Sequence, residues 1–227
     1  MTLLRPDLAR VIDHTLLAPS SGREALDRHC AEALDHAFYS VCVASRNVGH
    51  CADRLAGTGI RVCSVIGFPH GDASTAAKRA EAARAVQDGA DELDVVIALG
   101  ALADGDHRAV VEDLRAVVVA AAGRPVKVIL ETARLDERQT IVACALSQAA
   151  GAAFVKTATG FGGGGATVED VALMRSVVGP DVGVKASGGV RDAATADAML
   201  AAGATRIGAS RSVAIVGGAA GDARGDY

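Results

Sequence analysis

The sequence predicts a single-domain α/β protein folded as a (β/α)8 TIM barrel. Short β-branched runs alternate with Ala-rich stretches of helical character, the alternation gives eight strands, and 227 residues suit one such barrel. A doubly wound open sheet is the alternative fold, but no G-x-G-x-x-G motif follows the first strand. The barrel is expected over residues 1–216, and a flexible Gly-rich tail over residues 217–227.

The predicted strands are runs rich in Val and Ile, separated by segments long enough to hold a helix. This spacing is typical of parallel strands joined by right-handed crossovers. The eight strands are expected at residues 10–13, 40–43, 61–66, 92–96, 126–130, 154–157, 182–185 and 206–208.

Seven helices are expected between these strands. Asp136 precedes Gln139 by three residues, which is typical of a capping box at a helix start, and Gly151 stands where a helix C-cap belongs. The helices are expected at residues 22–37, 44–56, 74–88, 106–122, 136–150, 168–178 and 193–202.

The composition argues against nucleic acid and membrane as partners. The net charge is −4, there is no Trp, and aromatic residues make up 3% of the chain, so neither a basic stripe nor a stacking platform is present. The longest apolar runs, such as residues 116–122, are far shorter than the roughly 20 residues that span a bilayer.

Cysteine and histidine usage predicts neither disulfides nor a metal site. The five Cys are scattered without a C-x-x-C pair, and the six His are dispersed. Small buried thiols suit a reducing compartment, and the first residues lack the apolar segment of a secretory signal. We therefore expect a cytoplasmic protein.

Charged residues gather on one face of the predicted strands. In the fifth strand Lys127 shares a face with Glu131, opposite the apolar face that must pack against helices. A charge-balanced lumen that only stabilises the fold is the alternative, but buried ion networks are weak evidence for stability and barrel active sites lie at the C-terminal strand ends. Asp13, Lys156 and Lys185 are each expected to close a strand. The full lumen set is Asp13, Glu92, Asp94, Lys127, Glu131, Lys156 and Lys185.

Lys156 and Lys185 end neighbouring predicted strands, which lie about 4.8 Å apart. An amine nucleophile at neutral pH needs its pKa lowered by roughly three units, or about 4 kcal/mol. A second ammonium about 6 Å away supplies roughly 2.8 kcal/mol at an effective dielectric of about 20, and partial desolvation can supply the rest. The pair indicates Schiff-base catalysis on a carbonyl compound. The competing interpretation is that both lysines neutralise a phosphate.

Glycine-rich stretches follow each of the last three predicted strands and offer a separate phosphate site. Barrels commonly bind phosphate at the loops after strands seven and eight through backbone N–H groups, and Gly lets the backbone approach an anion closely. A phosphate held there leaves the lysines free for covalent chemistry. The expected phosphate-binding residues are Gly160, Ser187, Gly188, Gly189, Gly208 and Ser210.

Seven motifs, in order and at natural spacing, resemble the deoxyribose-phosphate aldolase family from about residue 11 to residue 216. The combination of KTATGF at 156–161 with KASGG at 185–189 is highly specific. The chain departs from the family pattern at the Gly run 162–165, at Arg211-Ser212 and at Ala44-Ser45. The other motifs are VIDHTLL at 11–17, VIGFPHG at 65–71, ELDVVI at 92–97, KVILET at 127–132 and RIGAS at 206–210.

The resemblance implies a metal-independent class I aldolase, a carbon–carbon lyase without a cofactor. The family reversibly cleaves 2-deoxy-D-ribose 5-phosphate to D-glyceraldehyde 3-phosphate and acetaldehyde in deoxynucleoside catabolism. By matching position, Lys156 forms the imine with the acetaldehyde-derived carbon, Lys185 perturbs its pKa and joins proton transfer, and Asp94 is the acid/base through an ordered water. Asp13 is a further catalytic candidate from its place in the lumen. The resemblance also suggests a homodimer, with the sugar phosphate and acetaldehyde as the small-molecule partners.

Tyr227, the last residue, is also a catalytic candidate. A phenol at the end of a Gly-rich tail could reach the barrel mouth and exchange a proton at the α-carbon of the imine. Family members often end in a similarly placed Tyr. The alternative is a disordered tail with an incidental terminal Tyr.

Two other functions stay open at this point. One is a different imine-forming aldolase or a sugar-phosphate isomerase on the same barrel, and the other is a non-catalytic sugar-phosphate sensor. Imine trapping separates an aldolase from an isomerase, and turnover separates an enzyme from a sensor.

Overall fold

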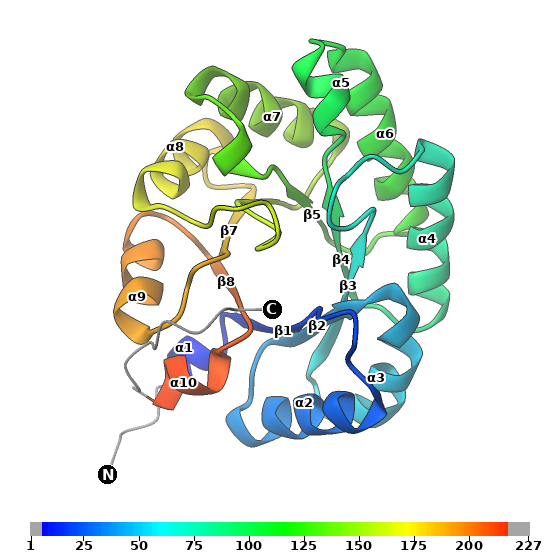
Figure 1. Ribbon diagram of the computed structural model, residues 1–227, viewed down its shortest axis with the longest axis vertical. Helices are drawn as coiled ribbons and strands as arrows, with labels where there is room; N and C mark the ends of the chain where they lie inside the picture. The colour runs from blue at the N-terminus through cyan, green and yellow to red at the C-terminus, as the bar shows by residue number, and fades with distance from the viewer. Residues whose placement is uncertain (1–5, 218–227) are drawn as a thin grey trace.

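The computed structural model describes residues 6–217, which form a closed barrel of eight parallel strands ringed by helices (Figure 1). Each strand pairs with its neighbour in the sequence, and β8 pairs with β1. The predicted (β/α)8 barrel is therefore confirmed, and the open sheet is excluded. The strands are β1 (Ile12–Leu16), β2 (Ser40–Ala44), β3 (Arg61–Ile66), β4 (Glu92–Val96), β5 (Val126–Ile129), β6 (Phe154–Lys156), β7 (Gly183–Ser187) and β8 (Arg206–Ala209).

Helices connect successive strands and cover the outside of the barrel (Figure 1). The capping box predicted at Asp136 and Gln139 is complete, and Gly151 takes the left-handed conformation (φ 92°) at the C-cap. None of the helices within residues 6–217 combines the length and apolar character needed to cross a lipid bilayer. The helices are α1 (Pro6–Ala9), α2 (Arg23–His36), η1 (Ser45–Asn47), α3 (Val48–Leu55), α4 (Thr75–Gln87), α5 (Leu99–Ala103), α6 (His107–Ala120), η2 (Thr132–Arg134), α7 (Glu137–Ala150), α8 (Val168–Val178), α9 (Ala193–Ala201) and α10 (Ser212–Gly217).

Several short elements differ from the sequence prediction. The helices α1, α5 and α10 were not expected, because four to six residues are too few to show a helical period. The helix expected over residues 44–56 is divided into the 3-10 turn η1 and the helix α3. Short helices are set by how the loops pack, which a sequence period does not report.

Two strands run at least two residues further than predicted. β1 continues from Asp13 to Leu16, and β7 continues from Lys185 to Ser187. The expectation that Asp13 and Lys185 close their strands is therefore wrong, whereas Lys156 does end β6. Small and polar residues extend these strands because the backbone ladder to the neighbouring strand continues, as it does from Ser187 to β8. Asp13 and Lys185 consequently lie within their strands, and Lys185 is the register partner of Lys156.

Apolar side chains fill the layer between the barrel and its helices. Val126, Val128 and Leu130 belong to this outer layer, while Lys127 faces inward and contacts Asp94 on β4. The alternation predicted for the fifth strand holds from Val126 to Ile129 and places Lys127 in the lumen. The prediction that Glu131 continues this face is wrong, because β5 ends at Ile129 and Glu131 lies beyond it with a left-handed backbone.

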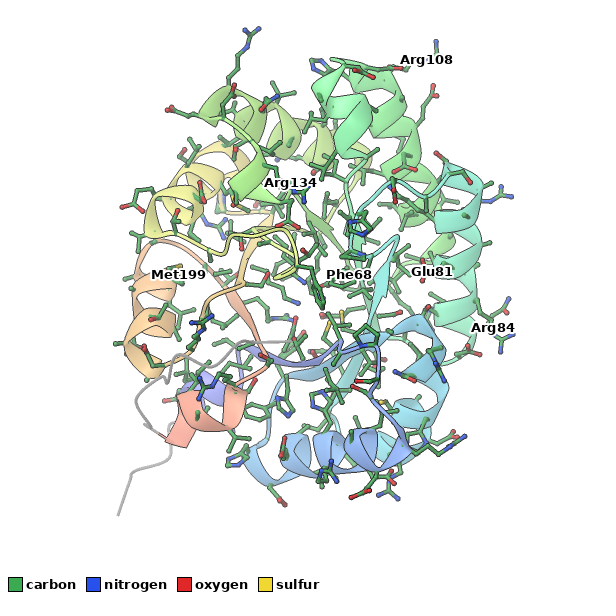
Figure 2. The ribbon with its side chains drawn as sticks, in the orientation of Figure 1. Phe68, Glu81, Arg84, Arg108, Arg134 and Met199 are labelled. Carbon is green, nitrogen blue, oxygen red and sulfur yellow. The ribbon has the colours of Figure 1, made fainter. Side chains whose placement is uncertain are left out.

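Charges on the outer helix faces behave differently from those inside. Figure 2 shows Phe68 toward the centre of the barrel, whereas Arg84 on α4 and Arg108 on α6 project outward. Both arginines pair four residues along their own helix, with Asp88 and Glu112, in exposed contacts of the kind that contribute little stability. These surface pairs therefore contribute little to the fold.

Candidate active site

Asp94 lies at the centre of a cluster of lysines inside the barrel. Its Oδ2 is 2.8 Å from Lys156 Nζ and 2.7 Å from Lys185 Nζ, and its Oδ1 is 2.8 Å from Lys127 Nζ. Strand register explains the convergence, because Asp94 pairs with Lys127 across β4 and β5 while Lys156 pairs with Lys185 across β6 and β7. Three strands thus bring their cations to one buried carboxylate.

A second carboxylate, Asp13, supports the cluster from β1. Its Oδ2 accepts from Lys185 at 2.5 Å, and its Oδ1 accepts from Ser40 at 2.7 Å and from Arg206 at 3.0 Å. Asp13 is fully buried, and each of its oxygens has a donor. It therefore fixes Lys185 from the side opposite Asp94.

Glu92 closes the floor of the lumen beneath these groups. Its Oε2 lies 2.6 Å from Lys127 and 3.0 Å from Arg206, and its Oε1 accepts from the Tyr39 hydroxyl at 3.1 Å. The Arg206 guanidinium also stacks over the Tyr39 ring, 3.5 Å from its centroid. Within residues 6–217, four basic side chains and three carboxylates meet in this network.

The network fixes the charge state of its deeper members. Burial acts to raise the pKa of Asp94, but Lys127, Lys156 and Lys185 hold it well below its ordinary value. Burial likewise acts to raise the pKa of Asp13, and the surrounding cations outweigh it and lower that pKa. For Lys185, burial acts to lower the pKa, while Asp13 and Asp94 raise it above its ordinary value. Asp94 is thus an anion and Lys185 a cation at neutral pH.

The two lysines do not face one another alone, as the sequence led us to expect. A carboxylate oxygen of Asp94 lies within 2.8 Å of both Lys156 and Lys185. This intervening anion offsets part of the repulsion between the two ammonium groups. Lys156 differs from the deeper lysines in another respect: among the described residues Asp94 is its one carboxylate contact, whereas Lys127 and Lys185 each contact at least two.

The loops after β6 and β7 meet at the barrel mouth. Ala166 N–H donates to Gly188 O at 2.9 Å, and a Cβ added to Gly165 would lie 2.5 Å from that same carbonyl oxygen. Gly188 and Gly189 both have positive φ (81° and 74°), which Gly adopts without strain. These loops border a cavity of about 370 Å³ lined by Gly160, Gly163, Gly164, Gly165, Gly189 and Arg191.

Only some of the predicted phosphate residues lie at this cavity, and Ser210, half-buried directly after β8, does not line it. Gly160 and Gly189 line it, and Gly188 lies in the adjoining turn. Gly208 instead leaves room for Lys185, because an added Cβ would lie 2.9 Å from Lys185 Cε. The Ser187 hydroxyl donates to a neighbouring carbonyl oxygen at 2.6 Å. Arg191 was not selected from the sequence, although it follows the KASGG motif closely.

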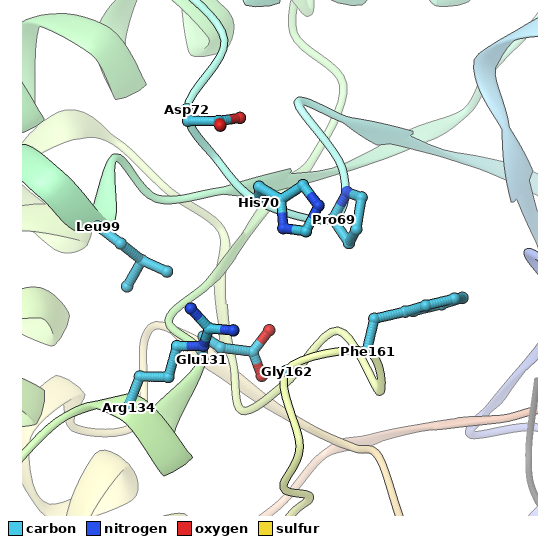
Figure 3. A pocket seen from close by; sticks show the side chains of 8 residues that line it. All are labelled: Pro69, His70, Asp72, Leu99, Glu131, Arg134, Phe161 and Gly162. Atoms are coloured by element: carbon cyan, nitrogen blue, oxygen red, sulfur yellow. The ribbon is translucent and has the colours of Figure 1, made fainter.

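A second cavity, of about 240 Å³, opens between the loops after β3, β5 and β6 (Figure 3). Figure 3 shows the His70 ring, from the loop after β3, and the Arg134 guanidinium and Glu131 carboxylate, both from the segment after β5, around this cavity. Its full lining is Pro69, His70, Asp72, Leu99, Glu131, Arg134, Phe161 and Gly162. The two cavities therefore offer polar groups from the loops after β3, β5, β6 and β7.

Two groups of potential metal ligands come together that the sequence did not reveal. One joins His14, His29 and Glu32, and the other joins Cys42 and Cys63 to Asp94. Some of their ligand atoms have protein partners: His14 Nε2 lies 2.9 Å from Glu32, and the Cys63 thiol donates to Asp94 at 3.1 Å. His14 Nδ1, in contrast, is buried without a hydrogen-bond partner among the described residues. Tyr227 lies outside the described residues, as does the predicted tail from residue 218 onward.

Comparisons with known proteins agree with the geometry. The family model described as DeoC/LacD family aldolase matches residues 8–223. A deoxyribose-phosphate aldolase of Brevibacillus brevis is 54% identical over 94% of this chain and 96% of its own, and one of Bdellovibrio bacteriovorus is 49% identical over 97% and 99%.

Solved structures of the same kind superpose closely. The crystal structure of a putative deoxyribose-phosphate aldolase from Coccidioides immitis has a TM-score of 0.91 at 44% identity, covering 93% of this chain and 85% of that one. The deoxyribose phosphate aldolase of Aeropyrum pernix has a TM-score of 0.87 at 36% identity, covering 93% and 90%.

Proposed function

The chain belongs to the DeoC/LacD aldolase family, and we propose that it reversibly cleaves 2-deoxy-D-ribose 5-phosphate to D-glyceraldehyde 3-phosphate and acetaldehyde. The observation that carries this proposal is the contact of Lys156 and Lys185 with the same oxygen of Asp94. It unites an amine at a strand end, a fixed positive charge and a buried anion within one site. Class I aldol chemistry needs a nucleophile, an electrostatic partner and a proton carrier of this kind.

Lys156 is the nucleophile of the proposed reaction. Its neutral amine adds to the C1 aldehyde of the open-chain sugar, and loss of water gives a protonated imine. The C2–C3 bond then breaks as the C3 hydroxyl loses its proton, which releases glyceraldehyde 3-phosphate and leaves the C2 carbon as an enamine. A proton added to C2 gives the acetaldehyde imine, and water hydrolyses this imine to return the lysine.

Asp94 and Lys185 serve the proton transfers of this sequence. The anionic Asp94 lies 2.8 Å from Lys156 Nζ, so it can stabilise the imine cation and accept the C3 hydroxyl proton through a water. Lys185 carries a positive charge 2.7 Å from Asp94 and can pass a proton through that carboxylate. Asp13 holds Lys185 in place and completes the proposed set. Tyr227 is proposed as a further proton carrier for the α-carbon.

Phosphate binds, in this proposal, at the Gly-rich loops after the last three strands. Backbone N–H groups and Gly residues let the chain approach the anion closely, and the cavity there is separate from the lysine cluster. The phosphate thereby positions the reacting carbons at a distance from its own charge. The proposed residues are Gly160, Ser187, Gly188, Gly189, Gly208 and Ser210.

Reductive trapping tests the imine assignment directly. Borohydride added with acetaldehyde should leave a single N-ethyl group on Lys156, found by peptide mass mapping, and Lys156→Ala should abolish both trapping and turnover. Ethylation of Lys185 or Lys127 in its place would overturn the assignment. Trapping by other aldehyde donors but not by acetaldehyde would indicate a different aldolase, and trapping without turnover would indicate a sensor.

Assembly and location are separate proposals. The resemblance suggests a homodimer, while the Aeropyrum pernix relative is described as having a unique tetrameric structure. Light scattering of the purified chain distinguishes a dimer from a tetramer. Cell fractionation tests the cytoplasmic location that the free, buried cysteines favour.

A further inference from the structure

Glu131 has a strained backbone just past the end of β5. Its dihedral angles (φ 58°, ψ 57°) lie in the left-handed region, which residues other than Gly seldom adopt. The backbone on both sides is fixed to β6 and its loop: Leu130 N–H donates to Lys156 O at 2.9 Å, and Thr132 N–H donates to Thr157 O at 3.0 Å. Backbone hydrogen bonds to Lys156, the proposed imine lysine, and to the residue after it therefore keep Glu131 in this strained conformation.

The turn after β6 encloses the Glu131 carboxylate, which is buried. Thr159 donates to Glu131 Oε2 twice, from its hydroxyl at 2.5 Å and from its backbone N–H at 3.3 Å. The same hydroxyl accepts from Phe161 N–H at 3.0 Å. Gly162 passes so close that an added Cβ would lie 2.5 Å from Glu131 Cδ. Residues 159–162 are thus wrapped around a single carboxylate.

This turn borders both mouth cavities. Gly160 lines the Gly-rich cavity, while Phe161 and Gly162 line the second cavity together with Glu131 itself. We propose that Glu131 is a positioning residue that holds the turn 159–162 so that the Gly160 backbone meets the substrate phosphate at a fixed distance from Lys156. This inference rests on the proposed function. It explains why a strained backbone is kept at a position where Gly would relieve the strain.

Kinetics on two substrates separate positioning from simple stabilisation. Glu131→Ala should raise the KM for 2-deoxyribose 5-phosphate about tenfold, with kcat changed less than about threefold and the KM for unphosphorylated 2-deoxyribose unchanged. The inhibition constant of inorganic phosphate should rise in the same proportion. Glu131→Gln is the matched control, because its amide oxygen still accepts from Thr159, and its KM should stay within about twofold of the wild type.

Thr159→Val provides an independent route to the same result. It removes the hydroxyl that donates to Glu131, so it should reproduce the rise in KM, and the double variant with Glu131→Ala should show less than the product of the two effects. If Glu131→Ala fails to fold, the Thr159→Val variant carries the test alone.

Three results would overturn the proposal: an unchanged KM, an equal loss on both substrates, or fully multiplicative effects in the double variant. A wild-type enzyme that does not cleave the sugar phosphate would refute the proposed function instead. In that case the phosphate inhibition or binding constant still reports whether Glu131 holds the turn.

Discussion

The molecule buries lysines in two different places, in the lumen and in the layer between the barrel and its helices. In the outer layer, Lys78 of α4 donates to Asp113 of α6 at 2.7 Å and to the Val96 carbonyl at 3.0 Å, and Thr75 donates to the other oxygen of Asp113 at 2.8 Å. One cation faces one anion, and both carboxylate oxygens have a donor. The charges of this pair are therefore matched one to one.

In the lumen cluster, by comparison, the basic and acidic side chains are not matched one to one. Three lysines share Asp94, the four basic side chains of this network outnumber its three carboxylates among the described residues, and Lys156 is the last residue of β6. Burial of a charge therefore does not distinguish a reactive site from a structural tie. What distinguishes the two clusters is whether their basic and acidic side chains are balanced in number.

The largest difference between the lumen cluster and the outer pair is expected when the carboxylate of each, Asp94 or Asp113, is replaced by an amide. Asp94→Asn should lower kcat by about a thousandfold or more, because it removes the proposed proton carrier and the anion that three lysines share. Asp113→Asn should leave kcat within about twofold. Steady-state assays of both variants measure the difference, and a comparable loss of kcat in Asp113→Asn would contradict the division.

The Asp113→Asn substitution, which should hardly change kcat, should instead lower the free energy of unfolding. Asp113→Asn leaves the Lys78 ammonium buried without its counter-charge, so the free energy of unfolding should fall by about 3–5 kcal/mol. Replacing both partners, Lys78→Met with Asp113→Leu, should return it to within about 1 kcal/mol of the wild type. Urea unfolding measures both. A double variant as unstable as the single one would show that the pair stabilises the fold beyond neutralising its own two charges.

A smaller effect is expected from buried groups that carry no charge. His14 and His29 stack at 3.9 Å between β1 and α2, and burial lowers the pKa of each to about 3. The unfolded chain binds these protons near pH 6.5, so stability should fall as pH decreases from about 6.5 toward 3, by about 2 kcal/mol per imidazole at pH 5.

The lumen carboxylates do not interfere with this measurement, because they change the stability in a different pH range. The pKa values of Asp13 and Asp94 are held below the ordinary value, so their stabilising contribution persists down to about pH 4 and is lost only below it. Urea unfolding at pH 7.5 and pH 5 should therefore report the imidazoles. His29→Gln should roughly halve the difference, and an unchanged difference would assign it to other groups.

The strand alternation allowed much of the site to be predicted from the sequence. Lys127, Asp94 and Lys156 could be assigned to the lumen because successive side chains point to opposite faces and the outer face has to be apolar. The Gly-rich stretches could be placed at the mouth because they follow strands. These inferences need only local periodicity and the closure of the barrel.

Other parts of the site depended on register and loop packing. The sequence did not predict that Asp94 would stand between Lys156 and Lys185, that Arg206 and Glu92 would form a floor, or that Lys78 would be buried. Strand register sets which side chains meet across the barrel, and no local pattern encodes it. A lysine on an Ala-rich helix gives no sign that a carboxylate from another helix will cover it.

The sequence by itself determined the barrel, the inward face of each strand and the order of the chemical groups along the chain, because these follow from periods of two and of 3.6 residues. Only the tertiary structure decided which of those groups come into contact with one another. In the folded chain the turn 159–162 packs around the Glu131 carboxylate. Lys78 pairs with the single carboxylate of Asp113, whereas Lys156 contacts Asp94, a carboxylate that two other lysines also contact. The physical reason is that ionic interactions depend on distances between residues remote in the sequence, and folding alone fixes those distances.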